Sequence, residues 1–281
     1  TQHGVVDAVD VMVPLVNSMD DRPPSAYGTA PGGPTRAQYD GFLQQPEREL
    51  WLYESCMSHG CGGAVDIGSP SASQLYFTGW PSYAIDASAV RNRAMEWFSF
   101  QYGATGELYY ETTQAYYDKA DPWTDQYEFD GNGDGTLFYP GTAAKIGGQT
   151  DIPVASLRLK MIREGLEDFE YLKLLSDLGG ADQARQIAQQ LFPHPWQAEA
   201  KPADLAAARV ALANAILARS GKPAQSAPTG SSSASPGSAS LSAGGGGGGG
   251  CGTAAGGPGG LLTLALLPLA LALQRLRARR R

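Results

Sequence analysis

The sequence predicts an α/β fold that is followed by helices, a linker and a single transmembrane helix. Over residues 1–178, short β-branched or aromatic runs alternate with longer amphipathic segments, as in a parallel sheet with helical crossovers. Residues 221–252 are almost entirely Gly, Ser, Ala and Pro, a composition that cannot offset the entropy of ordering and predicts a disordered linker. An uncharged aliphatic stretch follows. The predicted division is therefore 1–178 α/β body, 179–220 helical cap, 221–252 linker and 253–281 transmembrane helix with an Arg-rich tail.

Three segments have the composition of β-strands. Val5–Leu15 (VVDAVDVMVPL) is mostly apolar and β-branched, which is typical of a strand buried on both faces of a parallel sheet. Glu49–Ser55 (ELWLYES) and Gly106–Thr112 (GELYYET) are shorter and rich in aromatic residues. Because helical patterns separate all three, we expect the strands to run parallel.

Helices are expected between and after these strands. One begins near Thr35, and a second spans Ile85–Tyr102 and ends at Gly103, the residue type favoured just beyond a helix end. A long amphipathic helix should end near Leu178, with an inward face formed by Leu159, Ile162, Leu166, Phe169 and Leu172. Two Ala-rich helices, 181–190 and 202–220, form the predicted cap.

The charge of the chain disfavours a nucleic-acid partner. All 28 acidic residues lie at or before Asp204, whereas five of the 21 basic residues are among the last seven positions of the chain. The predicted body is therefore strongly acidic and lacks the cationic surface that phosphate backbones require. Neutral sugars are not disfavoured by this charge.

The C-terminal segment predicts a membrane anchor. Thr253–Leu273 has no charged residue over 21 positions, and a helix of that length spans about 31 Å, close to the thickness of a bilayer core. The Arg residues that follow place the C-terminus in the cytoplasm and the body outside. The alternative is a buried core helix. Because the chain opens at Thr1 without an initiator Met or a signal peptide, we expect a truncated start with any export signal upstream.

Cys56 and Cys61 flank His59 after the second predicted strand. In an exported protein a short-loop disulfide is the first interpretation. Metal binding by the two cysteines and His59 would need a further ligand, and free thiols are the third alternative.

The segment from Asp130 to Gly141 begins like a calcium loop. Asp130, Asn132, Asp134 and Gly135 follow its pattern, but the twelfth position is Gly141 in place of Glu. The favoured interpretation is a plain turn, and we predict no metal site and no cofactor. The sequence also contains no Gly-x-Ser-x-Gly elbow, Walker loop or dinucleotide fingerprint.

Three motifs together resemble a known family. They are SLRLKMIREGLEDFEYLKLL (Ser156–Leu175), GDGTLFYPG (Gly133–Gly141) and GELYYET. This order resembles the domain of unknown function 4091, which is related to the catalytic domain of glycoside hydrolase family 123. The resemblance implies that residues 1–178 are the last units of a (β/α)8 TIM-like barrel.

That family implies retaining β-N-acetylgalactosaminidase activity. An adjacent Asp-Glu pair works with the acetamido group of the substrate: Glu protonates the leaving oxygen while Asp orients the acetamide. No Asp-Glu dipeptide occurs in this chain, and the family pair lies on an earlier strand. We therefore assign no catalytic acid and expect this chain alone to be inactive.

The last 35 or so residues also resemble the myxobacterial C-terminal sorting signal, with a Gly-rich lead, Cys251-Gly252, an apolar helix and an Arg run. This resemblance implies transport to the cell surface, with processing near Cys251.

In a barrel, ligands meet the carboxyl ends of the strands. The candidate sugar contacts are therefore aromatic and acidic residues at or after those ends: Tyr53, Glu54, Trp80, Tyr110, Glu111 and Trp123. The alternative is that these side chains only pack the mouth of the barrel. The sequence thus predicts part of a surface-anchored glycosidase acting on amino-sugar glycans, with a non-catalytic carbohydrate-binding or adhesive module as the alternative.

Overall fold

The computed structural model describes residues 8–20, 36–55, 78–118, 121–129 and 131–221. All of them belong to one compact unit, residues 1–229. Within these ranges, no helix has both the length and the apolar character needed to cross a bilayer. The predicted disulfide between Cys56 and Cys61, the processing site at Cys251, the linker and the transmembrane segment fall outside the described residues.

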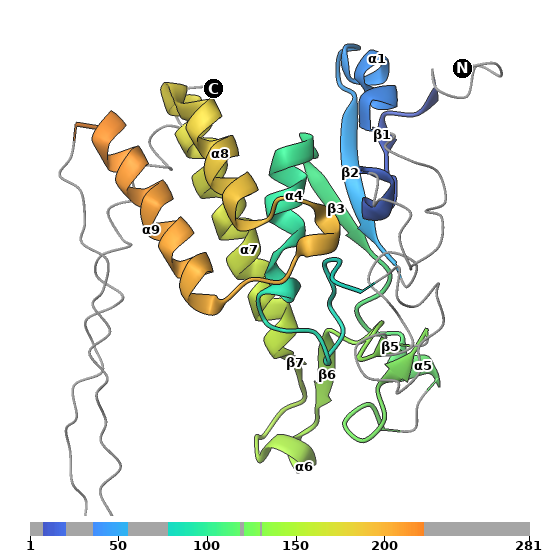
Figure 1. Cartoon of the computed structure of the whole chain (residues 1–281). Coiled ribbons are helices and arrows are strands. Elements are labelled where there is room, and N and C mark those ends of the chain that lie inside the picture. Colours follow the sequence, from blue (N-terminus) through green and yellow to red (C-terminus); the bar gives the residue numbers. More distant parts are fainter. Residues whose placement is uncertain (1–7, 21–35, 56–77, 119–120, 130, 222–281) are drawn as a thin grey trace, which may run out of the picture. The chain divides into compact units, whose positions relative to one another are not determined.

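The central element is a three-stranded parallel sheet (Figure 1). Its order is β1-β2-β3, formed by Val11–Met12, Glu49–Glu54 and Gly106–Tyr109. Glu54 pairs with Tyr109, so β2 and β3 reach the same edge together. The predicted parallel α/β arrangement is confirmed. These strands form an open sheet, and the closed barrel stays a prediction.

The two faces of this sheet have different surroundings. Leu50, Leu52 and Glu54 alternate along β2 on one buried face, and the two leucines share a core cluster with Met95 of the following helix. On the other face Trp51 and Tyr53 are partly exposed, and Leu108 of β3 is 38 % exposed. One face is therefore covered by helices and the other is only partly covered.

The helix before β3 begins later than predicted. α4 spans Met95–Tyr102 and ends at Gly103, whose φ of 69° is the left-handed geometry that glycine favours. Before α4, the Arg91 Nε donates to the carbonyl of Trp80 at 2.9 Å, and the Asn92 amide donates to the carbonyl of Ser82 at 2.5 Å. These side-chain contacts hold the preceding segment against the 80–84 loop, and Arg91–Arg93 forms a 3₁₀ turn.

Three long helices form a layer with α4, in which two of them pack on α4 and the last packs on the other two. They are α7 (Leu157–Leu175), α8 (Ala181–Leu191) and α9 (Pro202–Arg219), which lie side by side in Figure 1. The Ser156 hydroxyl accepts a hydrogen bond from the Leu159 amide and caps α7. One core cluster joins Trp97 and Phe98 of α4 with Leu172 of α7 and apolar residues of α8 and α9. The boundary predicted at residue 178 stays a prediction, but the helices on its two sides share this core.

The predicted inward face of α7 is wrong in part. Leu166 is 52 % exposed, whereas Arg158, Gly165 and Asp168 are buried together with Leu172. Apolar periodicity misplaced the face because charged side chains occupy buried positions in specific polar contacts.

Short elements complete the described part. They are α1 (Asp40–Leu43), α5 (Ala115–Asp118), α6 (Ala143–Ile146), the antiparallel pair β4 (Tyr127–Glu128) and β5 (Gly131–Asn132), and the antiparallel pair β6 (Phe138–Gly141) and β7 (Ile152–Ala155).

Candidate functional site

The carboxyl ends of β2 and β3 form the edge at which the predicted sugar contacts were placed. Burial raises the pKa of the Tyr53 phenol, and the charges of Asp134 and Tyr110 raise it further. Tyr110 follows β3 and is 56 % exposed, with its ring centroid 6.2 Å from that of Phe129. Glu111 comes next and accepts a weak hydrogen bond from the Thr113 hydroxyl at 3.5 Å.

Glu54 has a structural position in place of the predicted sugar contact. It is 1 % exposed, and its Oε1 accepts a hydrogen bond from the backbone amide of Tyr83 at 2.6 Å. Burial, followed by the charge of Glu107, raises its pKa well above the usual range. Side chains alternate along a strand, so Glu54 points to the helix-covered face while Tyr53 points to the other.

Trp80 is also a core residue. Its exposed fraction is 0 %, and its ring meets that of Trp196 edge to face at 5.9 Å. An indole enclosed in this way offers no face to a sugar. The sequence could not separate Trp80 from Trp123, because both lie in loops that follow a predicted strand.

Trp123 keeps an exposed ring in a fixed orientation. It is 37 % exposed, its Nε1 donates to the carbonyl of Pro140 at 2.8 Å, and its ring lies 4.9 Å from Tyr139 with planes inclined by 36°. A ring held at both its edge and its face loses little freedom on binding a ligand. Trp123 therefore remains a candidate sugar contact, as do Tyr53, Tyr110 and Glu111.

The segment after β3 is unusually rich in exposed aromatic side chains. Six of them lie between residues 110 and 129, and we call this set the aromatic segment: Tyr110, Tyr116, Tyr117, Trp123, Tyr127 and Phe129. Exposed aromatic rings concentrated in one stretch of chain are typical of binding surfaces, since burial would otherwise be favoured.

Arg158 fixes the loops at this edge and was missed by sequence reasoning. The side chain is 5 % exposed, and its guanidinium donates to the backbone carbonyls of Tyr83, Gly133 and Thr136. The planar guanidinium group of Arg158 thus joins the 80–84 loop to the turn before β6. The sequence did contain one indication of this role, which is the position of Arg158 in the first turn of the helix. A cation there interacts unfavourably with the helix dipole unless a specific partner compensates.

In the calcium-loop-like turn, the side chains of Asp134 and Asn132 form hydrogen bonds with other protein groups. Asp134 Oδ1 accepts hydrogen bonds from the Tyr109 hydroxyl at 3.0 Å and the Gly135 amide at 2.8 Å. The Asn132 amide donates to Asp86 at 3.2 Å. Burial raises the pKa of Asp134 to about 6. Asp130 lies outside the described residues, and the described residues contain no group of three or more His, Cys, Asp or Glu placed to hold a metal.

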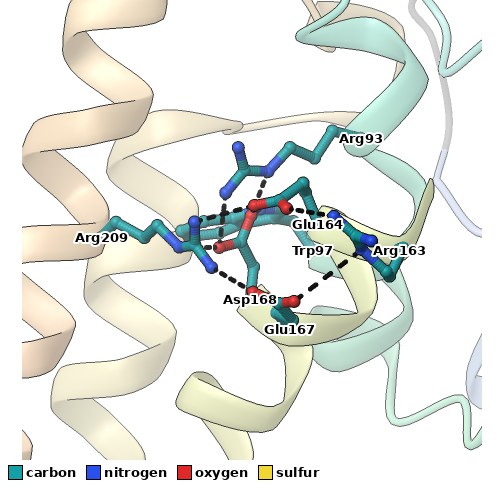
Figure 2. A network of polar contacts seen from close by, with 7 residues as sticks. All are labelled: Arg93, Trp97, Arg163, Glu164, Glu167, Asp168 and Arg209. Atoms are coloured by element: carbon teal, nitrogen blue, oxygen red, sulfur yellow. Dashed lines mark hydrogen bonds and ion pairs between the residues drawn. The ribbon is translucent and has the colours of Figure 1, made fainter. Parts of the chain in front are cut away.

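A buried ionic network accounts for the longest motif. Figure 2 shows the Asp168 carboxylate between two guanidinium groups: Arg93 of the 3₁₀ turn at 2.6 and 2.8 Å, and Arg209 of α9 at 2.8 Å. The Trp97 indole donates to the same carboxylate at 3.0 Å. Asp168 has no exposed area. Asp168 of this motif therefore holds α7 against α4 and α9.

A comparison with family models matches residues 73–175 to the family described as "Glycoside hydrolase 123, catalytic domain". This range is a little over a third of the 281 residues and contains β3, the aromatic segment and α7. The family resemblance drawn from the three motifs is confirmed. No curated protein matches the chain.

Proposed function

Since residues 73–175 form a glycoside hydrolase 123-like segment, we propose that the chain contributes the carbohydrate-binding edge of a glycosidase that acts on β-N-acetylgalactosaminide glycans. The observation that carries this proposal is that the matched range contains exposed aromatic residues directly after a parallel strand. Pyranose rings have apolar faces that stack on aromatic rings, and their hydroxyls suit carboxylate acceptors such as Glu111.

We further propose that hydrolysis follows the substrate-assisted retaining mechanism, with an Asp-Glu pair supplied by polypeptide beyond this chain. No Asp-Glu dipeptide in that order occurs among the 281 residues. Glu54 and Asp168 are poor substitutes, because both carboxylates are buried in protein contacts away from solvent. The expected behaviour of the 281-residue chain is therefore sugar binding without turnover.

Binding can be measured by titrating the chain with a β-N-acetylgalactosaminide and following intrinsic tryptophan fluorescence or calorimetric heat. Trp123→Ala removes a pre-oriented ring, and we expect it to weaken binding by roughly tenfold or more. Leu157→Ala is the matched control, because Leu157 is an apolar side chain 67 % exposed on α7. Equal affinities of the two variants, or no binding by the unmodified chain, would reject the proposed edge.

A second assay distinguishes the proposed enzyme from the alternative, a non-catalytic binding or adhesive module. Release of a chromogenic N-acetylgalactosaminide by a longer protein that carries this chain supports the enzyme. Retained glycan binding without release supports the module.

For location, we propose export and anchoring through residues 253–273, with the C-terminus cytoplasmic before any processing at Cys251. The uncharged stretch and the terminal Arg run support this arrangement. Protease protection of a C-terminal tag in intact cells, lost after permeabilisation, is the expected result.

A further inference from the structure

Two glutamates, Glu96 and Glu107, lie beneath the sheet and have no part in the proposed sugar edge. Glu96 is in the first turn of α4 and is 2 % exposed. Among the described residues, no other residue donates a hydrogen bond to either oxygen of its carboxylate. Glu107 is on β3, and one of its oxygens accepts a hydrogen bond from the Tyr83 hydroxyl at 2.5 Å.

Both glutamates line one small cavity. Its volume is about 50 Å³, and its remaining walls come from α4, the start of β3 and α7: Ser99, Thr105, Gly106, Leu166 and Phe169. A water molecule occupies about 30 Å³ in the liquid, so the cavity has room for one small ion with accompanying water. Its donor atoms are all oxygens.

Gly165 of α7 leaves the space that the Glu96 carboxylate occupies. A β-carbon at this position would lie 2.3 Å from Glu96 Oε2. Glycine inside a helix costs about 1 kcal/mol relative to alanine. An alanine at position 165 would favour the helix and would fill this space. Glycine at this position instead leaves room for the Glu96 carboxylate.

The charges of the two carboxylates are not balanced by a neighbouring cation in the described contacts. The guanidinium of Arg93, three residues before Glu96 in the chain, forms its ion pair with Asp168 at 2.6 Å. Burial raises the pKa of Glu96 well above its usual range, and the charge of Glu107 raises it further. Two carboxylates in one low-dielectric cavity are stable only if they are protonated or if a cation neutralises them.

We propose that Glu96 and Glu107 bind a divalent cation of the calcium class in this cavity. Two carboxylates match a charge of +2, and hard oxygen donors suit Ca²⁺, Mg²⁺ or Mn²⁺. The Ser99 hydroxyl and water complete the ligands. Because the protein supplies only two charged ligands, affinity is expected at the weak end of natural sites, about 10⁻⁴ to 10⁻³ M. The bound ion would join β3 to α4.

The test uses the whole 281-residue chain after removal of metal with a chelator. Tb³⁺ replaces Ca²⁺ in oxygen sites, and its luminescence is sensitised by nearby aromatic rings such as Tyr83. We expect a luminescence signal that Ca²⁺ displaces, and a melting temperature that rises with Ca²⁺ concentration.

Three variants test whether the Tb³⁺ luminescence comes from the cavity lined by Glu96 and Glu107. Glu96→Gln keeps the shape of the side chain and is expected to weaken Tb³⁺ binding by about tenfold or more, while the variant folds without metal. Glu170→Gln makes the same charge change on the exposed surface of α7 and should leave binding unaltered. Asp134→Asn tests the calcium-loop-like turn. The proposal is overturned if Glu96→Gln binds Tb³⁺ as the unmodified chain does, if Asp134→Asn alone removes the signal, or if the unmodified chain gives none.

Discussion

At the scale of single residues, the polar side chains near the strand ends are mostly engaged in positioning backbone. Arg158 connects three backbone carbonyls, and Asp134 connects the Tyr109 hydroxyl to the Gly135 amide. Apart from Glu111, the candidate residues that remain for ligand contact are aromatic. This separation of roles explains why charged residues near the edge do not by themselves indicate catalysis.

Arg158→Lys is expected to lower the free energy of unfolding by about 1–3 kcal/mol. A lysine keeps the charge, but one ammonium cannot reach three carbonyls with the geometry of a planar guanidinium. Urea denaturation followed by circular dichroism measures the loss. Arg163→Lys on the same helix is the control, since the Arg163 side chain is 64 % exposed. Similar losses in both variants would contradict the assigned contacts.

Asp134 gives a prediction about pH. Its pKa is raised to about 6 in the folded chain by burial, against about 3.9 in an unfolded chain. The folded state therefore binds the proton more tightly, and the stability that this group contributes is complete below about pH 4 and lost as the pH rises through 6.

Asp134→Asn cannot titrate, yet its amide oxygen can still accept both hydrogen bonds. Relative to the unmodified chain, we expect this variant to gain up to about 3 kcal/mol of unfolding free energy between pH 4 and pH 8. Denaturation at each pH in metal-free buffer measures the difference. Asp182→Asn on the surface of α8 should show no such trend. A pH-independent difference for Asp134→Asn would show that the carboxyl is not perturbed.

At the scale of elements, α7 organises the helical layer through charged residues. The Asp168 carboxylate binds the side chains of Arg93, Arg209 and Trp97, which come from three other elements, as Figure 2 shows. Glu164 and Glu167 add contacts to Arg209 at 3.1 and 3.0 Å. The cation of α9 is therefore surrounded by three carboxylates of α7.

Removing the central carboxylate should be costly. Asp168→Ala leaves two guanidinium groups without their buried partner, and the expected loss is about 3–5 kcal/mol. Asp177→Ala breaks an exposed pair with Lys173 of 2.6 Å and should cost less than about 1 kcal/mol. Chemical denaturation of both variants gives the comparison. A loss of under 1 kcal/mol for Asp168→Ala would mean that apolar packing alone holds these helices together.

At the scale of the whole molecule, the folded unit extends beyond the range that matches the family. The match ends at residue 175, but the core of α4 and α7 is completed by Ala184, Ile187, Leu212 and Ile216 of α8 and α9. A chain ending at residue 180 would expose Trp97, Phe98 and Leu172 to water.

We therefore expect the chain ending at residue 180 to aggregate or to lose its cooperative unfolding transition. A chain ending at residue 221 keeps α9 and should unfold cooperatively. Size-exclusion chromatography with circular dichroism distinguishes the two. A monomeric, cooperative 1–180 chain would show that α8 and α9 are an independent addition.

The parallel sheet and the positions of the last helices could be predicted from sequence because they depend on local patterns. Alternation of strand-like and helix-like segments indicated β2 and β3, and α8 and α9 were predicted to within one residue at each end. Gly103 marked the end of α4 because left-handed geometry at a helix end is a backbone property.

Burial of individual side chains was decided only by the tertiary structure. Glu54 and Trp80 looked like ligand contacts because their sequence neighbourhoods resemble those of Glu111 and Trp123, yet both are enclosed. The inward face of α7 was misplaced because Arg158, Gly165 and Asp168 face partners distant in sequence. Sequence periodicity reports how apolar residues repeat along one element, whereas the burial of a charge depends on partners that only the folded chain brings within hydrogen-bonding distance.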